Sequence, residues 1–173
     1  MLNALREQVN CFPESAIQLQ AVSAVHLGEV NSVLKAVIAV WDVSPRVKRL
    51  ALTAYQYDEY DFQQLDFLGA WQDGELVGFV SLEPTVYDPL QGKRMAMLVH
   101  GLYVTPEMHG VGLGTRLVNA AKQRARDKGH TTLLVRAERN AKAFFEKLGF
   151  TPLPVEDAHR DYPHRLSAAL DDG

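Results

Sequence analysis

The sequence HGVGLGTRL, at positions 109–117, places three glycines at alternate positions directly before an apolar stretch without proline. The apolar residues that follow recur at helical spacing (Leu113, Leu117, Val118, Ala121 and Ala125). A glycine turn that opens a helix leaves unpaired backbone N–H groups at the positive end of the helix dipole, where a phosphate binds favourably. A flexible connection between a strand and a helix is the alternative, and the glycines alone do not separate the two.

Two familiar phosphate-binding motifs are excluded by the residues that follow Gly114. A P-loop carries Lys and then Ser or Thr after its last glycine, whereas Gly114 is followed by Thr115 and Arg116. A dinucleotide fingerprint needs a glycine where Thr115 stands. It also follows the first strand of its fold, whereas this turn follows about the fourth predicted strand.

Along the 173-residue chain, segments in which apolar residues recur every second position alternate with segments in which they recur about every 3.6 positions. They predict strands at 17–22, 67–71, 76–82, 95–104, 131–135, 150–153 and 165–170, and helices at 27–41, 46–55, 113–128 and 141–148. The Asp73-Gly74 pair between two β-rich runs predicts a tight hairpin, and 88–92 reads as a loop. This order predicts one α/β domain over 16–171 with a mixed sheet, preceded by an N-terminal leader at 1–15.

The composition excludes several classes of partner. Hydrophobic residues make up 47%, charged residues 23%, and the net charge is −3, with basic and acidic residues mixed. We therefore expect no nucleic-acid partner and no attraction to anionic membranes. No apolar run approaches the roughly 18 residues of a membrane helix, and the N terminus lacks the order of a secretory signal. The single Cys11 cannot form an intramolecular disulfide, so we expect a cytoplasmic protein.

The residues around the glycines resemble motif A of the GNAT superfamily of N-acetyltransferases, whose core is Arg/Gln-x-x-Gly-x-Gly/Ala. Gly112 and Gly114 match its small residues, and His109 stands in the Arg/Gln place. The later sequence AKAFFEKLGF, at 141–150, is similar to motif B, commonly A-x-x-hydrophobic-Tyr-E-K-L-G-F. Both motifs occur in the right order and separation, so the resemblance extends over about 17–170. It implies a mixed, mostly antiparallel sheet with a V-shaped splay between strands 4 and 5, flanked by about four helices.

The resemblance implies acetyl-CoA as cosubstrate, and no metal. Strand 95–104 would carry a bulge, and backbone groups of Leu102 and Val104 would pair with the pantetheine as an added strand would. Backbone N–H groups from His109 to Thr115 would receive the pyrophosphate, and two phenylalanines would lie near the thioester arm. The cofactor-binding residues so implied are Leu102, Tyr103, Val104, His109, Gly110, Val111, Gly112, Leu113, Gly114, Thr115, Phe144 and Phe145.

Two residues depart from the family pattern. His109 is a weaker cation than Arg, although the backbone carries most of the phosphate contact. Phe145 stands where many members carry the Tyr thought to protonate the departing thiolate, and Phe has no proton to give. Either another acid serves, for which Tyr162 and His164 are the candidates, or the thiolate leaves without one.

Acetyl transfer to an amine needs a group that accepts the amine proton, directly or through water. Imidazole titrates near neutral pH, and strand alternation predicts that His100 and Leu102 share one face. Several family members, arylalkylamine acetyltransferases among them, carry a base His at this offset, so the resemblance implies His100 as the base. Position 98, where histone-type members place Glu, holds an apolar Leu. A half-buried histidine bonded to a neighbouring backbone group is an equally weighted alternative.

The stretch at 54–62 mixes aromatic residues with three acids, Asp58, Glu59 and Asp61. In the family this segment usually borders the acceptor site, and aromatic faces with carboxylates would suit a cationic amine. Aromatic packing on the sheet, with solvated acids between, is the favoured alternative.

The whole pattern predicts direct acetyl transfer from acetyl-CoA to a primary amine of a small molecule or peptide, with His100 and Tyr162 as catalytic residues. The alternative from another class is an acyl-CoA-binding sensor or regulatory module that has lost turnover, which Phe145 favours. A structural protein without CoA would require both motif matches to be accidental. The sequence leaves open whether the protein forms a homodimer.

Overall fold

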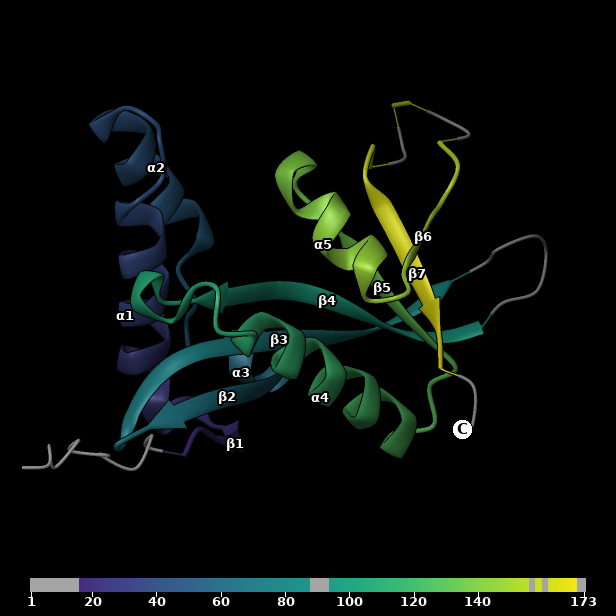
Figure 1. Cartoon of the computed structure of the whole chain (residues 1–173), viewed down its shortest axis with the longest axis horizontal. Coiled ribbons are helices and arrows are strands. Elements are labelled where there is room, and N and C mark those ends of the chain that lie inside the picture. Colours follow the sequence, from purple (N-terminus) through teal and green to yellow (C-terminus); the bar gives the residue numbers. More distant parts are fainter. Residues whose placement is uncertain (1–15, 88–93, 156–157, 160–161, 171–173) are drawn as a thin grey trace, which may run out of the picture.

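The computed structural model describes residues 16–87, 94–155, 158–159 and 162–170. The predicted leader with Cys11, the predicted loop at 88–92 and residue 171 lie outside the described residues. Within the described residues, seven strands form one sheet in the order β1-β2-β3-β4-β5-β7-β6, and the neighbours are antiparallel except for the parallel pair β4–β5 (Figure 1). The predicted mixed, mostly antiparallel α/β fold is confirmed.

The strands lie close to their predicted positions, although the second and third are longer. Their bounds are β1 (Gln18–Val22), β2 (Asp66–Gln72), β3 (Glu75–Tyr87), β4 (Arg94–Val104), β5 (Thr132–Arg136), β6 (Thr151–Pro152) and β7 (Arg165–Ala169). The hairpin between β2 and β3 forms at Asp73 and Gly74, whose φ angles are both positive, 52° and 84°. This is the conformation for which Asp-Gly was predicted.

Five α-helices flank the described sheet. They are α1 (Leu27–Ala39), α2 (Pro45–Tyr55), α3 (Asp61–Gln64), α4 (Leu113–Asp127) and α5 (Lys142–Lys147), with 3-10 turns η1 (Ala24–His26), η2 (Pro106–Met108) and η3 (Arg139–Ala141). The sequence predicted four of the α-helices, and the single-turn α3 lies within the stretch at 54–62. Helix α2 begins at Pro45 because the Ser44 hydroxyl accepts a hydrogen bond from the Val47 N–H, a standard N-terminal cap.

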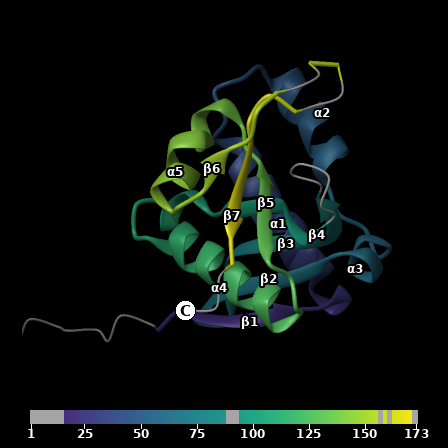
Figure 2. The same cartoon turned by 90° about the vertical axis from the view of Figure 1, so that its right-hand side faces the viewer.

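Helices α4 and α1 lie on opposite faces of the sheet (Figures 1 and 2), and each packs on a hydrophobic cluster of the described residues. Helix α4 covers one face with Leu113, Leu117, Val118, Ala121 and Ala125. Helix α1 covers the other with Val30 and Val33, which pack around Phe67 and Phe79. Alternation along β3 separates the faces: Val80 belongs to the α4 cluster and Phe79 to the α1 cluster.

Strands β4 and β5 separate part of the way along the sheet. Their register runs only from Ala96↔Thr132 to Val99↔Val135, whereas β4 continues to Val104 and stays paired with β3. The register between β3 and β4 passes from Leu82↔Val99 to Ser81↔Gly101, so His100 is an extra residue and forms a β-bulge. The splay and the bulge predicted for this strand are both present. None of the helices in the described part of the chain is long and apolar enough to cross a membrane.

Candidate active site

The glycine turn joins β4 to α4 through η2. Gly110 and Gly112 have φ angles of 79° and 80°, a left-handed conformation that glycine adopts most readily. A Cβ atom at either position would meet nothing within 4 Å, so these glycines serve the backbone conformation and not a close contact. The first backbone hydrogen bond of α4 runs from Arg116 N–H to the Gly112 carbonyl at 3.1 Å. The N–H groups from Leu113 to Thr115 therefore precede the helical ladder, at the end of α4 that favours an anion.

Gly114 has a different role from the other two glycines. A Cβ atom at Gly114 would lie 3.3 Å from the ring of Phe144, so the glycine allows α5 to approach the first turn of α4. The side chain of Leu113 is buried in the α4 cluster. The turn is thus held by packing on the side of α5 and open on the side of Gly110 and Gly112.

His109 does not extend toward the start of α4. Its Nε2 lies 2.9 Å from the Val104 carbonyl oxygen, and its backbone N–H donates to the Pro106 carbonyl at 3.2 Å. The prediction counted the N–H groups from His109 to Thr115 as phosphate donors, and the first of them is already paired within the chain. The reason is the turn of η2, which uses the N–H of His109 for its own hydrogen bond.

The backbone of β4 beyond the bulge has one side paired and one side open. Thr105 N–H donates to the Val77 carbonyl at 3.0 Å. Because paired and unpaired positions alternate in an antiparallel ladder, Tyr103 also faces β3, whereas Leu102 and Val104 face away from it. They face the side where β5 no longer pairs. This geometry is compatible with the predicted pairing of Leu102 and Val104 with pantetheine. The Val104 carbonyl also contacts Nε2 of His109.

Tyr103 does not fit the predicted cofactor contact. Its backbone faces β3, and its ring packs 5.3 Å from that of Phe79 in the α1 cluster. Burial raises the pKa of Tyr103 to about 12, so the phenol stays neutral at physiological pH. The N–H groups of the neighbours Leu102 and Tyr103 thus differ in direction: that of Leu102 faces the opening and that of Tyr103 does not.

The two phenylalanines of motif B lie in different surroundings. Phe144 is partly exposed and lies against Gly114, next to the glycine turn. Phe145 is only 4% exposed and belongs to the α4 cluster, with Phe144 and Phe150 at 5.1 and 5.3 Å between ring centroids. The structure therefore brings Phe144 to the predicted site and places Phe145 in the core behind it.

His100 lies on the face opposite to that of Leu102, so the predicted shared face is wrong. The ring of His100 lies 6.1 Å from that of Tyr57, a member of the α1 cluster, whereas Leu102 packs against the α4 cluster. The bulge is the physical reason, because one extra residue reverses the alternation beyond it. The alternative interpretation expected a backbone group beside this imidazole; the contact seen among the described residues is with a side chain, since Nδ1 lies 3.5 Å from a carboxylate oxygen of Glu83.

Tyr57 and Ser81 form a buried polar pair beside the bulge. Their hydroxyl oxygens lie 2.9 Å apart, and a Cβ atom at Gly101 would come within 2.5 Å of the Tyr57 hydroxyl. Burial raises the pKa of Tyr57 well above its ordinary value, so this phenol is neutral. Sequence reasoning missed Ser81 and Glu83. Only the antiparallel register of β3 and β4 brings them to the bulge.

Two of the three acids of the stretch at 54–62, Asp58 and Asp61, stabilise a turn. Asp58 accepts hydrogen bonds from the N–H groups of Tyr60 and Asp61, at 2.8 and 3.1 Å. Asp61 accepts one from the Asp58 N–H at 2.8 Å. With Tyr57 buried, the packing interpretation describes these residues better than the amine-binding one.

Tyr162 and His164 lie on the segment that leads into β7. The Ala137 N–H donates to the His164 carbonyl at 2.9 Å, which places this segment beside the end of β5. Tyr162 is 44% exposed, and within the described ranges no hydrogen bond or ring contact joins it to His100. Contacts thus join the glycine turn to Val104, through His109, and place Phe144 beside Gly114, whereas among the described residues none joins His100 to Tyr162.

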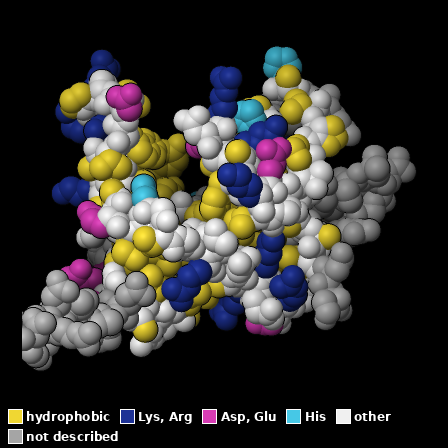
Figure 3. Space-filling model, viewed as in Figure 1, with side chains coloured by type: hydrophobic (Ala, Val, Ile, Leu, Met, Phe, Trp, Pro, Cys, Tyr) yellow, Lys and Arg dark blue, Asp and Glu magenta, His cyan; other side chains and the backbone are white. Residues whose placement is uncertain are grey.

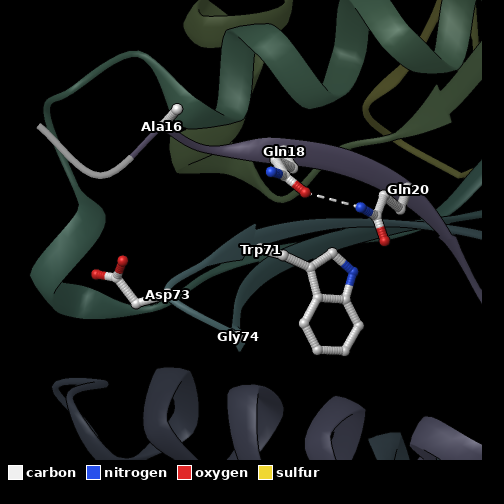
Figure 4. Close-up of a pocket in the computed structure, with 6 residues that line it drawn as sticks. All are labelled: Ala16, Gln18, Gln20, Trp71, Asp73 and Gly74. Atoms are coloured by element: carbon white, nitrogen blue, oxygen red, sulfur yellow. Dashed lines mark hydrogen bonds between the residues drawn. The ribbon is translucent and has the colours of Figure 1, made fainter.

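In the view of Figure 3 the surface is hollowed above β4. Helices α1 and α2 lie on one side of this hollow, and α5 and β7 lie on the other. Hydrophobic side chains gather on the walls of this hollow. A separate cavity of about 370 Å³ lies at the β1 edge of the sheet, between β1 and the β2–β3 hairpin (Figure 4). It is lined by Ala16, Gln18, Gln20, Trp71, Asp73 and Gly74, and so contains none of the predicted site residues.

Known proteins share this sequence pattern and this fold. A model of the acetyltransferase (GNAT) family matches residues 36–150. The uncharacterized N-acetyltransferase YhfO of Bacillus subtilis is 34% identical over 84 residues, which span 47% of this chain and 55% of that protein. The matched region therefore covers only about half the length of this curated relative.

Two solved structures are similar in fold. The PaiA N-acetyltransferase of Thermoplasma acidophilum, in complex with coenzyme A, has a TM-score of 0.69 at 18% identity, over 89% of this chain and 99% of that one. A GNAT family acetyltransferase of Brucella melitensis, in complex with acetyl-CoA, has a TM-score of 0.62 at 17% identity, over 91% and 90% of the two chains.

Proposed function

This chain belongs to the GNAT acetyltransferase family, and on that premise we propose that it transfers an acetyl group from acetyl-CoA directly to a primary amine of a small molecule or a peptide. The observation that carries the proposal is that the open backbone side of β4 continues into the glycine turn. The outward-facing N–H and C=O groups of Leu102 and Val104 lead along the opening between β4 and β5 to the glycine turn.

The residues present fit acetyl-CoA. An extended pantetheine would pair with Leu102 and Val104, as an added strand pairs with a free sheet edge. The pyrophosphate would be received by N–H groups from Gly110 to Thr115 at the start of α4, where the left-handed glycines leave open space. Phe144 would contact the ligand next to the turn. The CoA and acetyl-CoA complexes of the Thermoplasma and Brucella proteins support this assignment.

The chemistry assigned to the chain is acid–base and electrostatic. The amine nitrogen forms a bond to the thioester carbonyl carbon, the carbon–sulfur bond breaks, and the amine proton passes to His100 directly or through a water. The N–H of Leu102 is the donor that faces the carbonyl oxygen as negative charge develops on it. Tyr162 is proposed as the acid for the departing thiolate, since Phe145 cannot supply a proton. Support for Tyr162 is its exposed side chain, two residues before His164, whose carbonyl accepts from Ala137 just after β5.

A panel of primary amines tests the proposal. Release of free CoA thiol is followed with each amine and acetyl-CoA, and mass spectrometry identifies the acetylated product. Turnover with at least one amine is expected. Binding of acetyl-CoA without turnover on any amine would instead support the sensor or regulatory module, which the aromatic Phe145 favours. No melting shift with saturating acetyl-CoA or CoA would contradict both.

The remaining expectations stay proposals drawn from the sequence. They are a single domain over 16–171, a cytoplasmic location and the absence of a nucleic-acid partner, with a homodimer left open. The mixed charge and the unbroken order of elements support them.

A further inference from the structure

We propose that Glu83 is a positioning residue for His100, holding its Nδ1 proton so that the lone pair of Nε2 faces the acceptor amine. This inference rests on the proposed function, because it assigns a partner to the proposed base. It concerns two side chains from different strands, which the antiparallel register of β3 and β4 brings together.

Alternation along β4 places His100 on the face of Glu83, because its neighbour Val99 belongs to the α4 cluster on the other face. Glu83 lies opposite Leu98 in the β3–β4 register, and Leu82 lies opposite Val99. Along β3, Ser81 and Glu83 share the face on which Ser81 meets the buried Tyr57. The extra residue in β4 presents its imidazole on this same face, where Nδ1 of His100 lies 3.5 Å from Oε2 of Glu83.

Tyr57 limits the movement of the imidazole on a second side. Its ring centroid lies 6.1 Å from that of His100, with an interplanar angle of 58°. Tyr57 is itself fixed by its hydrogen bond to Ser81 and by edge contacts with Phe67 and Phe79. The imidazole thus has an aromatic neighbour and a carboxylate beside it, while its side chain stays 45% exposed.

The carboxylate selects between the two tautomers of neutral imidazole. One ring nitrogen of a neutral histidine carries the proton and the other carries a lone pair. An acceptor-only carboxylate beside Nδ1 favours the tautomer with the proton on Nδ1, which leaves Nε2 free to accept a proton from the amine. The separation of 3.5 Å is longer than a hydrogen bond, as catalytic contacts commonly are before substrate binds.

Imidazole nitrogen NMR tests the tautomer without any need for turnover. In nitrogen–proton correlation spectra of the full chain, with His100 assigned by comparison with His100→Asn, we expect the proton on Nδ1. In Glu83→Ala the signal should move toward a mixture of both tautomers. An unchanged tautomer in Glu83→Ala would overturn the inference.

Steady-state kinetics test the effect of Glu83 on turnover. Glu83→Ala should lower kcat by roughly 10- to 100-fold, as loss of a hydrogen bond to a charged group does, with little change in the KM for acetyl-CoA. Glu83→Gln, which keeps an oxygen acceptor, should retain more activity than Glu83→Ala. Glu75→Ala, which removes another exposed acid from β3, is the matched control and should retain full activity.

A double-mutant cycle separates positioning from a general structural effect. In the His100→Ala background, Glu83→Ala should cause no further loss, because its role acts through the imidazole. An equal loss in both backgrounds, or full activity in Glu83→Ala, would contradict the role of Glu83 and leave the acetyl transfer itself intact. Lack of turnover by the unmodified protein would contradict the proposed function, while the NMR result still decides the pairing.

Discussion

Nε2 of His109 lies 2.9 Å from the carbonyl oxygen of Val104, so the first residue of the glycine motif is turned back onto the strand that precedes it. The contact has two consequences for a ligand that pairs with β4. It occupies one lone pair of a carbonyl that faces the opening, and it withdraws the imidazole from the start of α4. A residue in the Arg/Gln place of the family motif thus interacts with the chain itself.

Replacement of His109 by Arg should tighten acetyl-CoA binding. The guanidinium remains charged at all physiological pH values, reaches further than imidazole, and binds phosphate in bidentate fashion. The substitution also removes the imidazole from the Val104 carbonyl. Isothermal titration with acetyl-CoA measures the change, and His109→Ala is the control that frees the carbonyl without adding a cation. A weaker affinity in His109→Arg than in His109→Ala would contradict this assignment.

Gly112→Asp should abolish the melting shift caused by acetyl-CoA. The substitution adds a negative charge where the pyrophosphate is proposed to lie, at a φ of 80° that costs a side chain about 1–2 kcal/mol. Gly129, at the far end of α4, has a φ of 79° and also has open space around it. Gly129→Asp therefore carries the same backbone strain and the same charge. It should melt lower than the unmodified protein but keep its acetyl-CoA shift. Loss of the shift in both variants would assign the effect to strain alone.

His100→Ala should lower turnover by roughly 10²–10⁴-fold while acetyl-CoA affinity stays nearly intact, as loss of a general base does. The activity of the variant should recover as pH rises, because more of the acceptor amine is then neutral in solution. Rates across the pH range, with folding checked by circular dichroism, measure both effects. Full activity at neutral pH would return His100 to a structural role beside Tyr57.

Asp66→Asn should lower the melting temperature and should make the melting temperature less sensitive to pH in the acidic range. Asp66 on β2 accepts from Arg124 at 2.7 Å and lies 2.6 Å from the Lys128 ammonium, which ties α4 to the sheet. Burial disfavours the charged form, but hydrogen bonds from the two cations outweigh it, so the pKa of Asp66 lies below its ordinary value. A lowered carboxylate pKa stabilises the fold above the unfolded pKa, and this contribution is lost as pH falls through the folded pKa.

The expected loss in Asp66→Asn is about 1 kcal/mol at neutral pH, since both cations are partly exposed and screened. Melting curves between roughly pH 2 and pH 6 should converge for the two proteins at the acidic end. Gln123→Ala, which removes a surface contact with Asp127 on the same helix, is the control. Parallel curves that never converge would show that the carboxylate charge contributes nothing.

Local signals predicted much of the fold because each acts over a few residues. The Asp73-Gly74 hairpin, the start of α2 at Ser44-Pro45 and the glycines before α4 each depend on a backbone conformation that neighbouring residues impose. The splay also followed from the resemblance. The helix predicted to reach position 41 ends at Ala39 in the structure, since helix ends depend on hydrogen bonds that periodicity does not report.

The sequence by itself determined the α/β order, the family and the turn at which a phosphate is proposed to bind, because those features depend on spacing along the chain. Only the tertiary structure decided which side chains meet at His100. A single bulge in β4 put His100 and Leu102 on opposite faces, although alternation along one strand predicts that they share a face. The antiparallel register brought Glu83 and Ser81 from β3 to the bulge. Packing likewise separated Phe144, at the glycine turn, from Phe145 in the core. Spacing along one strand cannot report a residue inserted against its neighbour, since the bulge is a property of the pair of strands.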